Sequence, residues 1–173
     1  ATSQRGQSVV DMWNQLAVYS NANIHRAVHR LADEATQAYE GARDAVRDFL
    51  NAESRDEIIF TSGTTASINL VAFSFGEVFI KEGDEVIVTE AEHHSNIVPW
   101  QMMCSRKGAV LKVLPVDQDG HLMLDKLDDL LTSRTRIMAV THVSNVLGLI
   151  NPVKKIVEKC HSVGAAVLVD GAQ

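Results

Sequence analysis

From residue 57 onward the chain alternates short apolar segments with segments of helical periodicity, and this alternation limits the possible fold more than any other feature. The candidate strands are Glu57–Thr61, Glu85–Thr89, Ala109–Pro115, Arg136–Thr141 and Ala165–Asp170. The candidate helices are Thr64–Phe75, Val98–Arg106, Asp125–Leu131 and Pro152–Val163. Strands and helices that alternate at this spacing predict an α/β fold with a mostly parallel sheet, covered by helices on both faces.

Glycine and proline positions support these helix boundaries. Gly76, Gly108 and Gly164 each follow a candidate helix, where a glycine commonly ends the last turn. Pro152 lies at the start of the last helix, where its missing N–H group costs nothing.

The residues before the alternating region are helical in pattern. Ser8–Ser20 and Asp33–Leu50 carry apolar residues at helical spacing, and the polar stretch 21–30 between them is expected to form a loop or a short helix. We therefore expect an N-terminal helical segment over residues 1–56. Residues 57–173 are expected to form the first part of an α/β domain.

The composition is that of an ordinary globular protein, with 46% hydrophobic and 22% charged residues among 173. The net charge of −6 offers no general attraction to nucleic acid or to an anionic membrane. No apolar run approaches the roughly 20 residues of a membrane span. Cys104 and Cys160 are too few and too far apart for a disulfide framework. We expect a cytoplasmic protein with no nucleic-acid or membrane partner.

The segment Phe60–Thr65 follows a candidate strand and opens a helix. The turn at Gly63 lets backbone N–H groups point at one place, and the helix N-terminus with the hydroxyls of Thr64 and Thr65 makes a cradle for a phosphate. The segment lacks the Gly-Lys-Ser/Thr of a P-loop. A Ser/Thr cap on an ordinary helix is the alternative interpretation.

His93 and His94 follow the next candidate strand, where a histidine can stack on an aromatic ring or transfer protons. Adjacent side chains point in different directions, so we expect only one of the two to serve a site. No HExxH pattern or Cys/His spacing indicates zinc, and we predict no metal site. A solvated or core histidine is the alternative.

Asn145 and Asp170 also follow candidate strands. Asn145 can donate a hydrogen bond to a ligand oxygen, with a polar turn as the alternative. Asp170 ends the last strand after four apolar residues, and Gln173 comes shortly after it. Ligands of such sheets bind beyond the carboxyl ends of the strands. Polar groups after successive strands therefore fit a planar, phosphorylated cofactor with a ring nitrogen and a ring oxygen.

Five segments of the chain resemble the SufS-type (group II) cysteine desulfurases, in the class V aminotransferase group of pyridoxal-phosphate (PLP) enzymes. They are Asn23–His29, Thr61–Thr65, Glu92–Gln101, Thr141–Gly148 and Val169–Gln173. The resemblance runs from end to end. It implies a PLP-dependent transferase fold of type I (aspartate aminotransferase-like) with an incomplete sheet, because the C-terminal part of the large domain and the small domain are absent from this N-terminal half.

The resemblance also implies roles for the matched residues. The implied cofactor-binding residues are Thr64, Thr65, His93, Asn145, Asp170 and Gln173. The two threonines would hold the cofactor phosphate, and the histidine would stack on the pyridine ring and act catalytically on protons. The aspartate would bond the pyridinium nitrogen, and the last two amides would contact the phenolic oxygen. His25 and Arg26 would lie near the substrate entrance or the dimer partner.

For the whole protein, the resemblance implies conversion of L-cysteine to L-alanine, with the sulfur left as an enzyme persulfide for iron–sulfur cluster assembly. It further implies a homodimer and a sulfur-acceptor protein. Selenocysteine lyase activity on L-selenocysteine, cysteine-sulfinate desulfinase activity, and a lysine-less scaffold relative are the alternatives.

Two groups that complete this reaction lie outside the match. The Schiff-base lysine and the persulfide cysteine of the family come after the Val169–Gln173 motif, and neither Cys104 nor Cys160 is expected to replace that cysteine. Cys104 lies in a helical stretch beside Met102 and Met103, which favours a buried structural thiol. We expect the 173-residue chain by itself to be inactive.

Overall fold

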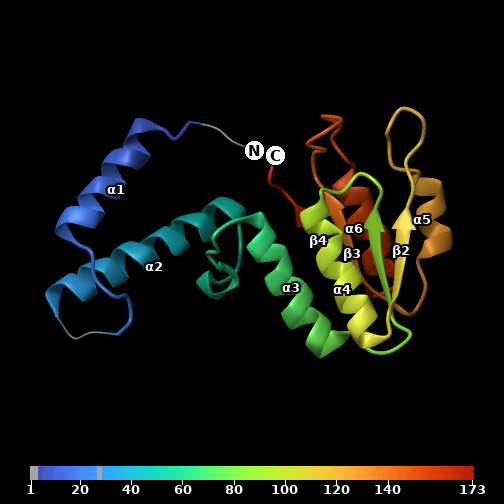
Figure 1. Cartoon of the computed structure of the whole chain (residues 1–173), viewed down its shortest axis with the longest axis horizontal. Coiled ribbons are helices and arrows are strands. Elements are labelled where there is room, and N and C mark those ends of the chain that lie inside the picture. Colours follow the sequence, from blue (N-terminus) through green and yellow to red (C-terminus); the bar gives the residue numbers. More distant parts are fainter. Residues whose placement is uncertain (1–3, 27–28) are drawn as a thin grey trace. The chain divides into compact units, whose positions relative to one another are not determined.

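A computed structural model describes residues 4–26 and 29–173 of the chain (Figure 1). The chain divides into two compact units, one ending at Phe60 and the other spanning Thr61–Gln173. Two residues of the Asn23–His29 motif, Ala27 and Val28, lie outside the described residues.

The larger unit is built on a four-stranded parallel sheet. Its strands are β1 Glu85–Thr89, β2 Val110–Leu114, β3 Thr135–Thr141 and β4 Ala166–Asp170, in the spatial order β2-β1-β3-β4. All three strand pairs are parallel. The central strand β3 is buried along almost its whole length, as expected for a parallel strand covered on both faces. This sheet confirms the predicted α/β class.

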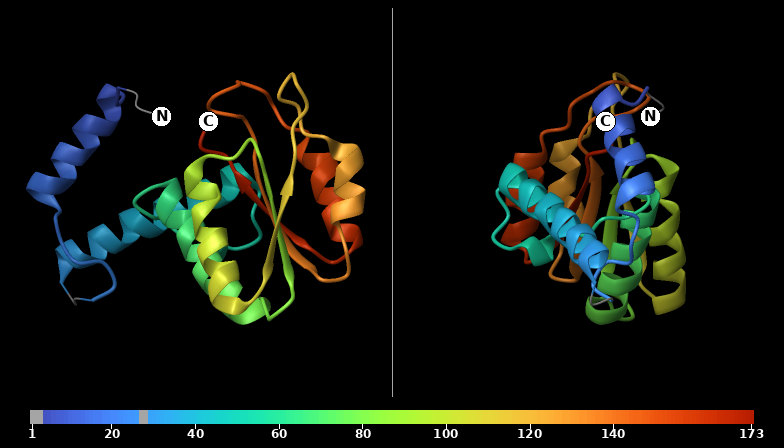
Figure 2. Two further views of the ribbon diagram at one scale, coloured as in Figure 1. Left: turned by 45° about the vertical axis from the view of Figure 1, so that its right-hand side comes forward. Right: turned by 90° about the vertical axis from the view of Figure 1, so that its left-hand side faces the viewer.

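Helices cover both faces of the sheet, as Figure 2 shows in its left view. Helices α3 Thr64–Phe79 and α4 Val98–Lys107 pack on one face, around a cluster that includes Ile68, Trp100 and Val86. On the other face lie α5 Leu124–Leu130 and α6 Val153–Ser162. Their cluster includes Leu127, Ile156 and Met138. Successive side chains of a strand point to opposite faces of the sheet, so each strand contributes apolar side chains to both clusters.

The predicted strand at Glu57–Thr61 is wrong. A short 3-10 helix, η1 Arg55–Glu57, occupies its start, and Ser54 caps that helix in a reciprocal capping box. The Arg43 guanidinium donates to the carbonyl oxygens of Arg55, at 2.7 Å, and Ile58, at 3.1 Å. These carbonyls are therefore satisfied by a side chain and not by a neighbouring strand.

Gly76 does not end α3, which continues to Phe79. Gly76 is buried inside the helix, and a Cβ built on it would lie 2.6 Å from Cγ of Met103 on α4. The glycine is therefore a close-approach position between two helices. Gly108 does follow its helix in the left-handed conformation, at φ 68°, and Gly164 lies just after α6 at φ 79°.

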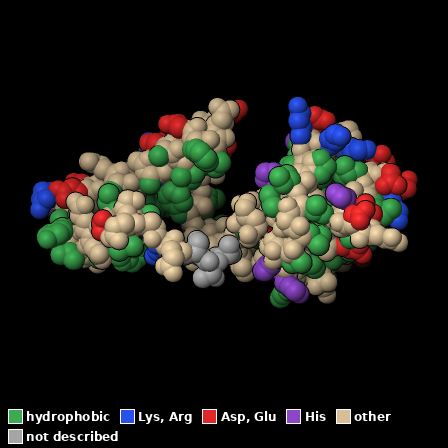
Figure 3. Space-filling view, turned by 90° about the horizontal axis from the view of Figure 1, so that it is seen from above, with side chains coloured by type: hydrophobic (Ala, Val, Ile, Leu, Met, Phe, Trp, Pro, Cys, Tyr) green, Lys and Arg blue, Asp and Glu red, His purple; other side chains and the backbone are tan. Residues whose placement is uncertain are grey.

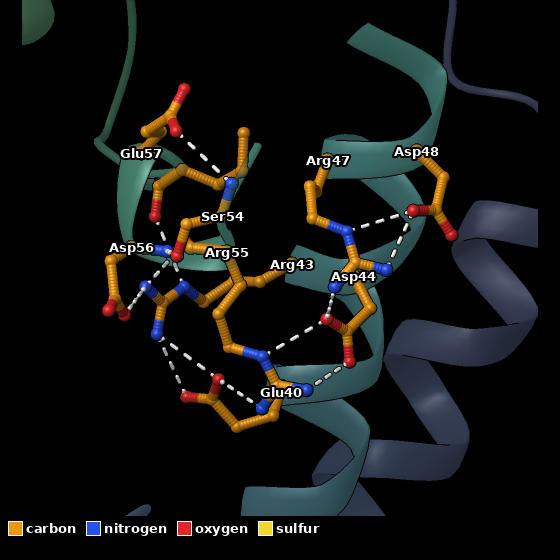
Figure 4. A network of polar contacts seen from close by, with 10 residues as sticks. Glu40, Arg43, Asp44, Arg47, Asp48, Ser54, Arg55, Asp56 and Glu57 are labelled. Atoms are coloured by element: carbon orange, nitrogen blue, oxygen red, sulfur yellow. Dashed lines mark hydrogen bonds and ion pairs between the residues drawn. The ribbon is translucent and has the colours of Figure 1, made fainter. Parts of the chain in front are cut away.

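The N-terminal unit contains helices α1 Gln7–Tyr19 and α2 Arg30–Leu50, in agreement with the sequence pattern. Figure 4 shows the polar network that joins the second half of α2 to η1. Arg55 pairs with both Glu40 and Asp44, while Arg43 bonds both oxygens of Glu40 at 3.1 Å. Several partly buried charges that share partners stabilise the junction more than isolated surface pairs do.

Helix α1 has no buried residue, and its apolar side chains stay on the surface. Met12, Trp13 and Val18 are all exposed, and hydrophobic side chains are visible on the surface of the N-terminal unit in Figure 3. Within the described part of the chain, no helix combines the length and apolar character needed to cross a membrane.

Two glycine-to-alanine substitutions should change stability in opposite directions. We expect Gly76→Ala to destabilise the protein by about 1–3 kcal/mol, because the new methyl group overpacks the contact with Met103. Gly41→Ala, in α2 with open space around its Cβ position, should stabilise by about 0.5–1 kcal/mol through helix propensity. Denaturant unfolding of both variants measures the difference, and equal effects would contradict the assigned packing of Gly76.

Candidate functional site

A cavity of about 700 Å³ lies where the strands β3 and β4 end and the helix α3 begins. Its lining is mostly polar. The lining residues are Ser62, Gly63, Thr64, Thr65, Ala66, His93, Ser95, Thr141, Val143, Asn145, Asp170, Ala172 and Gln173. The structure therefore brings together in one cavity all six residues that the resemblance implies for the cofactor.

The N-terminus of α3 forms one end of the cavity. No side chain caps this helix, so the N–H groups of its first turn are free to bind a ligand. Gly63 precedes the helix with φ 155° and ψ 174°, a conformation that is essentially restricted to glycine. The Thr61 hydroxyl donates to the Gly63 carbonyl at 3.1 Å and contacts the Ser67 hydroxyl at 2.7 Å, which fixes the turn. Thr64 and Thr65 add hydroxyls beside the free N–H groups.

Asp170 adds a buried carboxylate to the lining of the same cavity. It is the last residue of β4 and pairs in register with Thr141 at the end of β3. The N–H of Ala172 donates to Oδ1 of Asp170 at 3.0 Å, and the N–H of His142 donates to its backbone carbonyl at 2.8 Å. One backbone N–H thus orients the carboxylate, which keeps further acceptor capacity toward the cavity.

His93 enters the cavity from the loop after β1, immediately before the short helix η2 His94–Asn96. Its Nδ1 accepts the backbone N–H of Ser95 at 3.2 Å and lies 2.8 Å from the Ser95 hydroxyl. A backbone N–H only donates, so Nδ1 is the acceptor and the neutral ring carries its proton on Nε2. His94 is exposed, and its ring is nearly perpendicular to that of His93.

Asn145 and Gln173 lie on exposed backbone at the rim of the cavity. The loop that carries Asn145 is shaped by Ser144, whose hydroxyl accepts the N–H groups of Val146 and Leu147. Asn151 closes the same loop, because its side-chain amide donates to the carbonyl of Thr141 at 2.8 Å. Ser144 and Asn151, both buried, therefore hold the loop that presents Asn145 to the cavity.

His25 and Arg26 belong to the N-terminal unit. His25 has a positive φ of 60°, which is uncommon for a residue with a side chain. Its N–H donates to the Thr36 hydroxyl at 3.1 Å, and its Nε2 lies 2.9 Å from a carboxylate oxygen of Glu40. Its ring also contacts Tyr39 edge to face. The role of His25 and Arg26 near a substrate entrance or dimer partner stays a prediction.

Sequence reasoning missed a group of buried polar residues behind the cavity wall. Glu92, Asn96 and Thr89 are all buried, and Thr89 and Asn96 each donate a hydrogen bond to Glu92, although each residue stands in or beside a recognised motif. The available signal was an acidic residue and an asparagine four positions apart at a strand end. A third partner of Glu92, the backbone N–H of Thr141, is 49 residues away in sequence, and no local pattern reveals it.

The fold and the cavity define an α/β protein in which an uncapped helix N-terminus and a buried carboxylate line one cavity at the carboxyl ends of the strands. The chain belongs to the aminotransferase class-V family, whose match covers residues 1–173.

Relatives named cysteine desulfurase match the whole chain. One from Enterobacter sp. (strain 638) is 50% identical over 173 residues, and one from Synechococcus elongatus is 52% identical over the same length. The chain spans 43% of the first protein and 28% of the second. The solved apo structure of a cysteine desulfurase from Thermococcus onnurineus NA1 has a TM-score of 0.92 at 38% identity, covering 99% of this chain and 42% of that one.

Both cysteines are unsuited to nucleophilic chemistry. Cys104 and Cys160 are free thiols buried in the two apolar clusters. Burial raises the pKa of each thiol to about 11, so little thiolate exists at neutral pH. The burial of Cys104 confirms that it is a structural thiol.

We expect neither cysteine to react with iodoacetamide in the folded protein at pH 8, because alkylation requires an accessible thiolate. Both should react after unfolding in guanidinium. Mass spectrometry of the corresponding peptides measures this difference, and rapid labelling of either cysteine in the native state would contradict its assigned burial.

Proposed function

We propose that this chain forms the N-terminal part of a PLP-dependent cysteine desulfurase of the SufS type. The observation that carries the proposal is the cavity, in which an uncapped helix end and a buried carboxylate line the same space. The helix end suits a phosphate, and the carboxylate suits a cationic ring nitrogen. The named relatives and the class-V family, whose members use PLP, support the same conclusion.

The phosphate end of the proposed site is the first turn of α3. Free backbone N–H groups and the partial positive charge of the helix N-terminus favour a doubly charged anion. The hydroxyls of Thr64 and Thr65 add two donors at this place. Since Gly63 has no Cβ, the backbone approaches the phosphate without steric interference.

The ring end of the proposed site depends on Asp170 and His93. The Asp170 carboxylate would accept a hydrogen bond from the protonated ring nitrogen and so keep the ring charged, and the bound cofactor would supply an electron sink. His93 covers the ring and acts as the catalytic acid–base group through Nε2, because Nδ1 is already engaged with Ser95. Asn145 and Gln173 donate to the phenolic oxygen.

The chemistry needs two groups that the chain does not supply from its own cavity. The buried thiols of Cys104 and Cys160 cannot serve as the persulfide carrier. We assign that thiol and the Schiff-base lysine to the remainder of the full-length protein. In this proposal, residues 1–56 form an N-terminal helical segment and residues 57–173 form the first part of the large PLP-binding domain.

The proposal extends to the partners of the whole protein. L-cysteine is the substrate, and the products are L-alanine and an enzyme persulfide that passes to a sulfur-acceptor protein for iron–sulfur cluster assembly. The protein acts as a cytoplasmic homodimer, with His25 and Arg26 near the substrate entrance or the partner subunit. These features rest on the resemblance of the motifs to the SufS-type branch.

Asp170→Asn in the full-length protein tests the proposed site. We expect the dissociation constant for PLP to rise by roughly tenfold to a hundredfold, because a hydrogen bond between charged groups is replaced by a neutral one. Alanine formation from L-cysteine should fall with it. Asp119→Asn, which changes an exposed carboxylate in a turn, is the matched control and should leave both values unchanged. Equal PLP affinity in the two variants would exclude Asp170 as the ring partner.

The 173-residue chain expressed alone should form no alanine from L-cysteine when PLP is added, because the lysine and the reactive thiol are absent from its cavity. An assay of alanine against the full-length protein makes the comparison. Stoichiometric alanine from the chain alone would overturn the assignment of these groups to the remainder of the protein.

A further inference from the structure

The buried carboxyl group of Glu92 joins three segments that form the wall of the cavity. Its Oε1 accepts the hydroxyl of Thr89 at 2.6 Å and the backbone N–H of Thr141 at 2.9 Å. Its Oε2 accepts the side-chain amide of Asn96 at 2.6 Å. These partners lie at the end of β1, at the end of β3 and in the short helix η2. One side chain therefore holds the loop of His93 against two strand ends.

All three groups around Glu92 are donors, and the orientation of Asn96 follows from Trp100. The indole N–H of Trp100 can only donate, and it points at Oδ1 of Asn96 at 3.1 Å. The NH₂ of Asn96 must therefore face Glu92. Both carboxyl oxygens of Glu92 receive hydrogen bonds, and the ionised form satisfies all three donors at once.

Two buried carboxyl groups therefore lie near each other, because Asp170 lines the cavity and Glu92 lies behind its wall. Among the residues that the structure describes, no Lys, Arg or His forms an ion pair with either one. Burial raises the pKa of Glu92, the Asp170 charge adds to this rise, and the three donors oppose it. An uncompensated pair of buried anions favours a cation in the space beside it.

We propose that Glu92 is a positioning residue of the site. Its carboxylate fixes the loop that carries His93, and its buried charge reinforces Asp170 in favouring a protonated ring nitrogen in the cavity. The inference rests on the proposed function and deepens it, because it assigns the preference for a cationic ring to two carboxylates and not to Asp170 alone.

Glu92→Gln tests this assignment. An amide cannot satisfy the three donors. Its NH₂ group faces the amide NH₂ of Asn96 if it takes the position of Oε2, and it faces the Thr141 N–H beside Thr89 if it takes the position of Oε1. Turning Asn96 around would only move the conflict to Trp100. Glu90→Gln is the matched control, because exposed Glu90 accepts the Val116 N–H at 2.9 Å and the new amide keeps an acceptor.

Two measurements on the full-length protein report the effect. The dissociation constant for PLP should rise on the order of tenfold in Glu92→Gln and stay unchanged in Glu90→Gln. The ¹⁵N resonance of PLP labelled at the pyridine nitrogen reports protonation of the ring. Removing a nearby negative charge disfavours the cation, so the protonated signal should be lost at lower pH in Glu92→Gln than in the wild type. Among the described residues, the charge of Asp170 on β4 acts on Glu92, and His93 is the next residue on the same loop, with its Nδ1 against Ser95.

The outcomes separate this inference from the proposed function. A wild-type protein that does not bind PLP refutes the proposed function and the inference with it. A wild type that binds PLP, with Glu92→Gln matching Glu90→Gln in affinity and ¹⁵N titration, refutes the role of Glu92 alone. A weaker affinity without a change in the titration refutes the electrostatic part.

A second pair of variants covers the case in which Glu92→Gln does not fold. Thr89→Val removes one donor to Glu92 at nearly constant volume, and Thr89→Ser keeps the hydroxyl. We expect PLP affinity to fall several-fold in the valine variant and to be retained in the serine variant. Equal affinities in the two would contradict the positioning role.

Discussion

The site depends on the parallel pairing of β3 with both of its neighbours. Because the strands run in one direction, their last residues reach the same edge, and Thr141 stands in register with Asp170. The backbone continues this alignment beyond the strands, since the N–H of His142 donates to the Asp170 carbonyl at 2.8 Å. A slip in register would move the Asp170 carboxylate away from the cavity and expose buried apolar side chains.

Helix α3 serves the site with one end and the core with the other. Its N-terminus after Gly63 lines the cavity, while Gly76 in its second half lets the helix approach Met103 of α4 closely. Ile68 and Ala72 anchor the same helix in the core cluster. The packing of the helix on the sheet therefore determines where its free N–H groups lie in the cavity.

The electrostatics of the cavity are divided between these two elements. Free N–H groups at the α3 end favour an anion, and the buried carboxylates of Asp170 and Glu92 favour a cation. A ligand with a phosphate and a protonated ring offers both charges at once. Low local dielectric strengthens each of these interactions, which explains why buried partners such as Asn96 and Trp100 are fully satisfied by hydrogen bonds.

Periodicity predicted the α/β class and the parallel sheet, because it is a local signal along the chain. Strand ends together with the motif resemblance indicated the polar residues that the cavity brings together. Tertiary structure decided the rest. Residues 57–61 form no strand: η1 ends at Glu57, and the carbonyl of Ile58 accepts a hydrogen bond from Arg43 of α2. Gly76 lies inside α3 and not at its end, and Met103 of α4 leaves no room there for a Cβ. The carboxyl group of Glu92 is positioned partly by the backbone N–H of Thr141, which donates to it. A hydrogen bond between residues so far apart in sequence leaves no pattern in either segment.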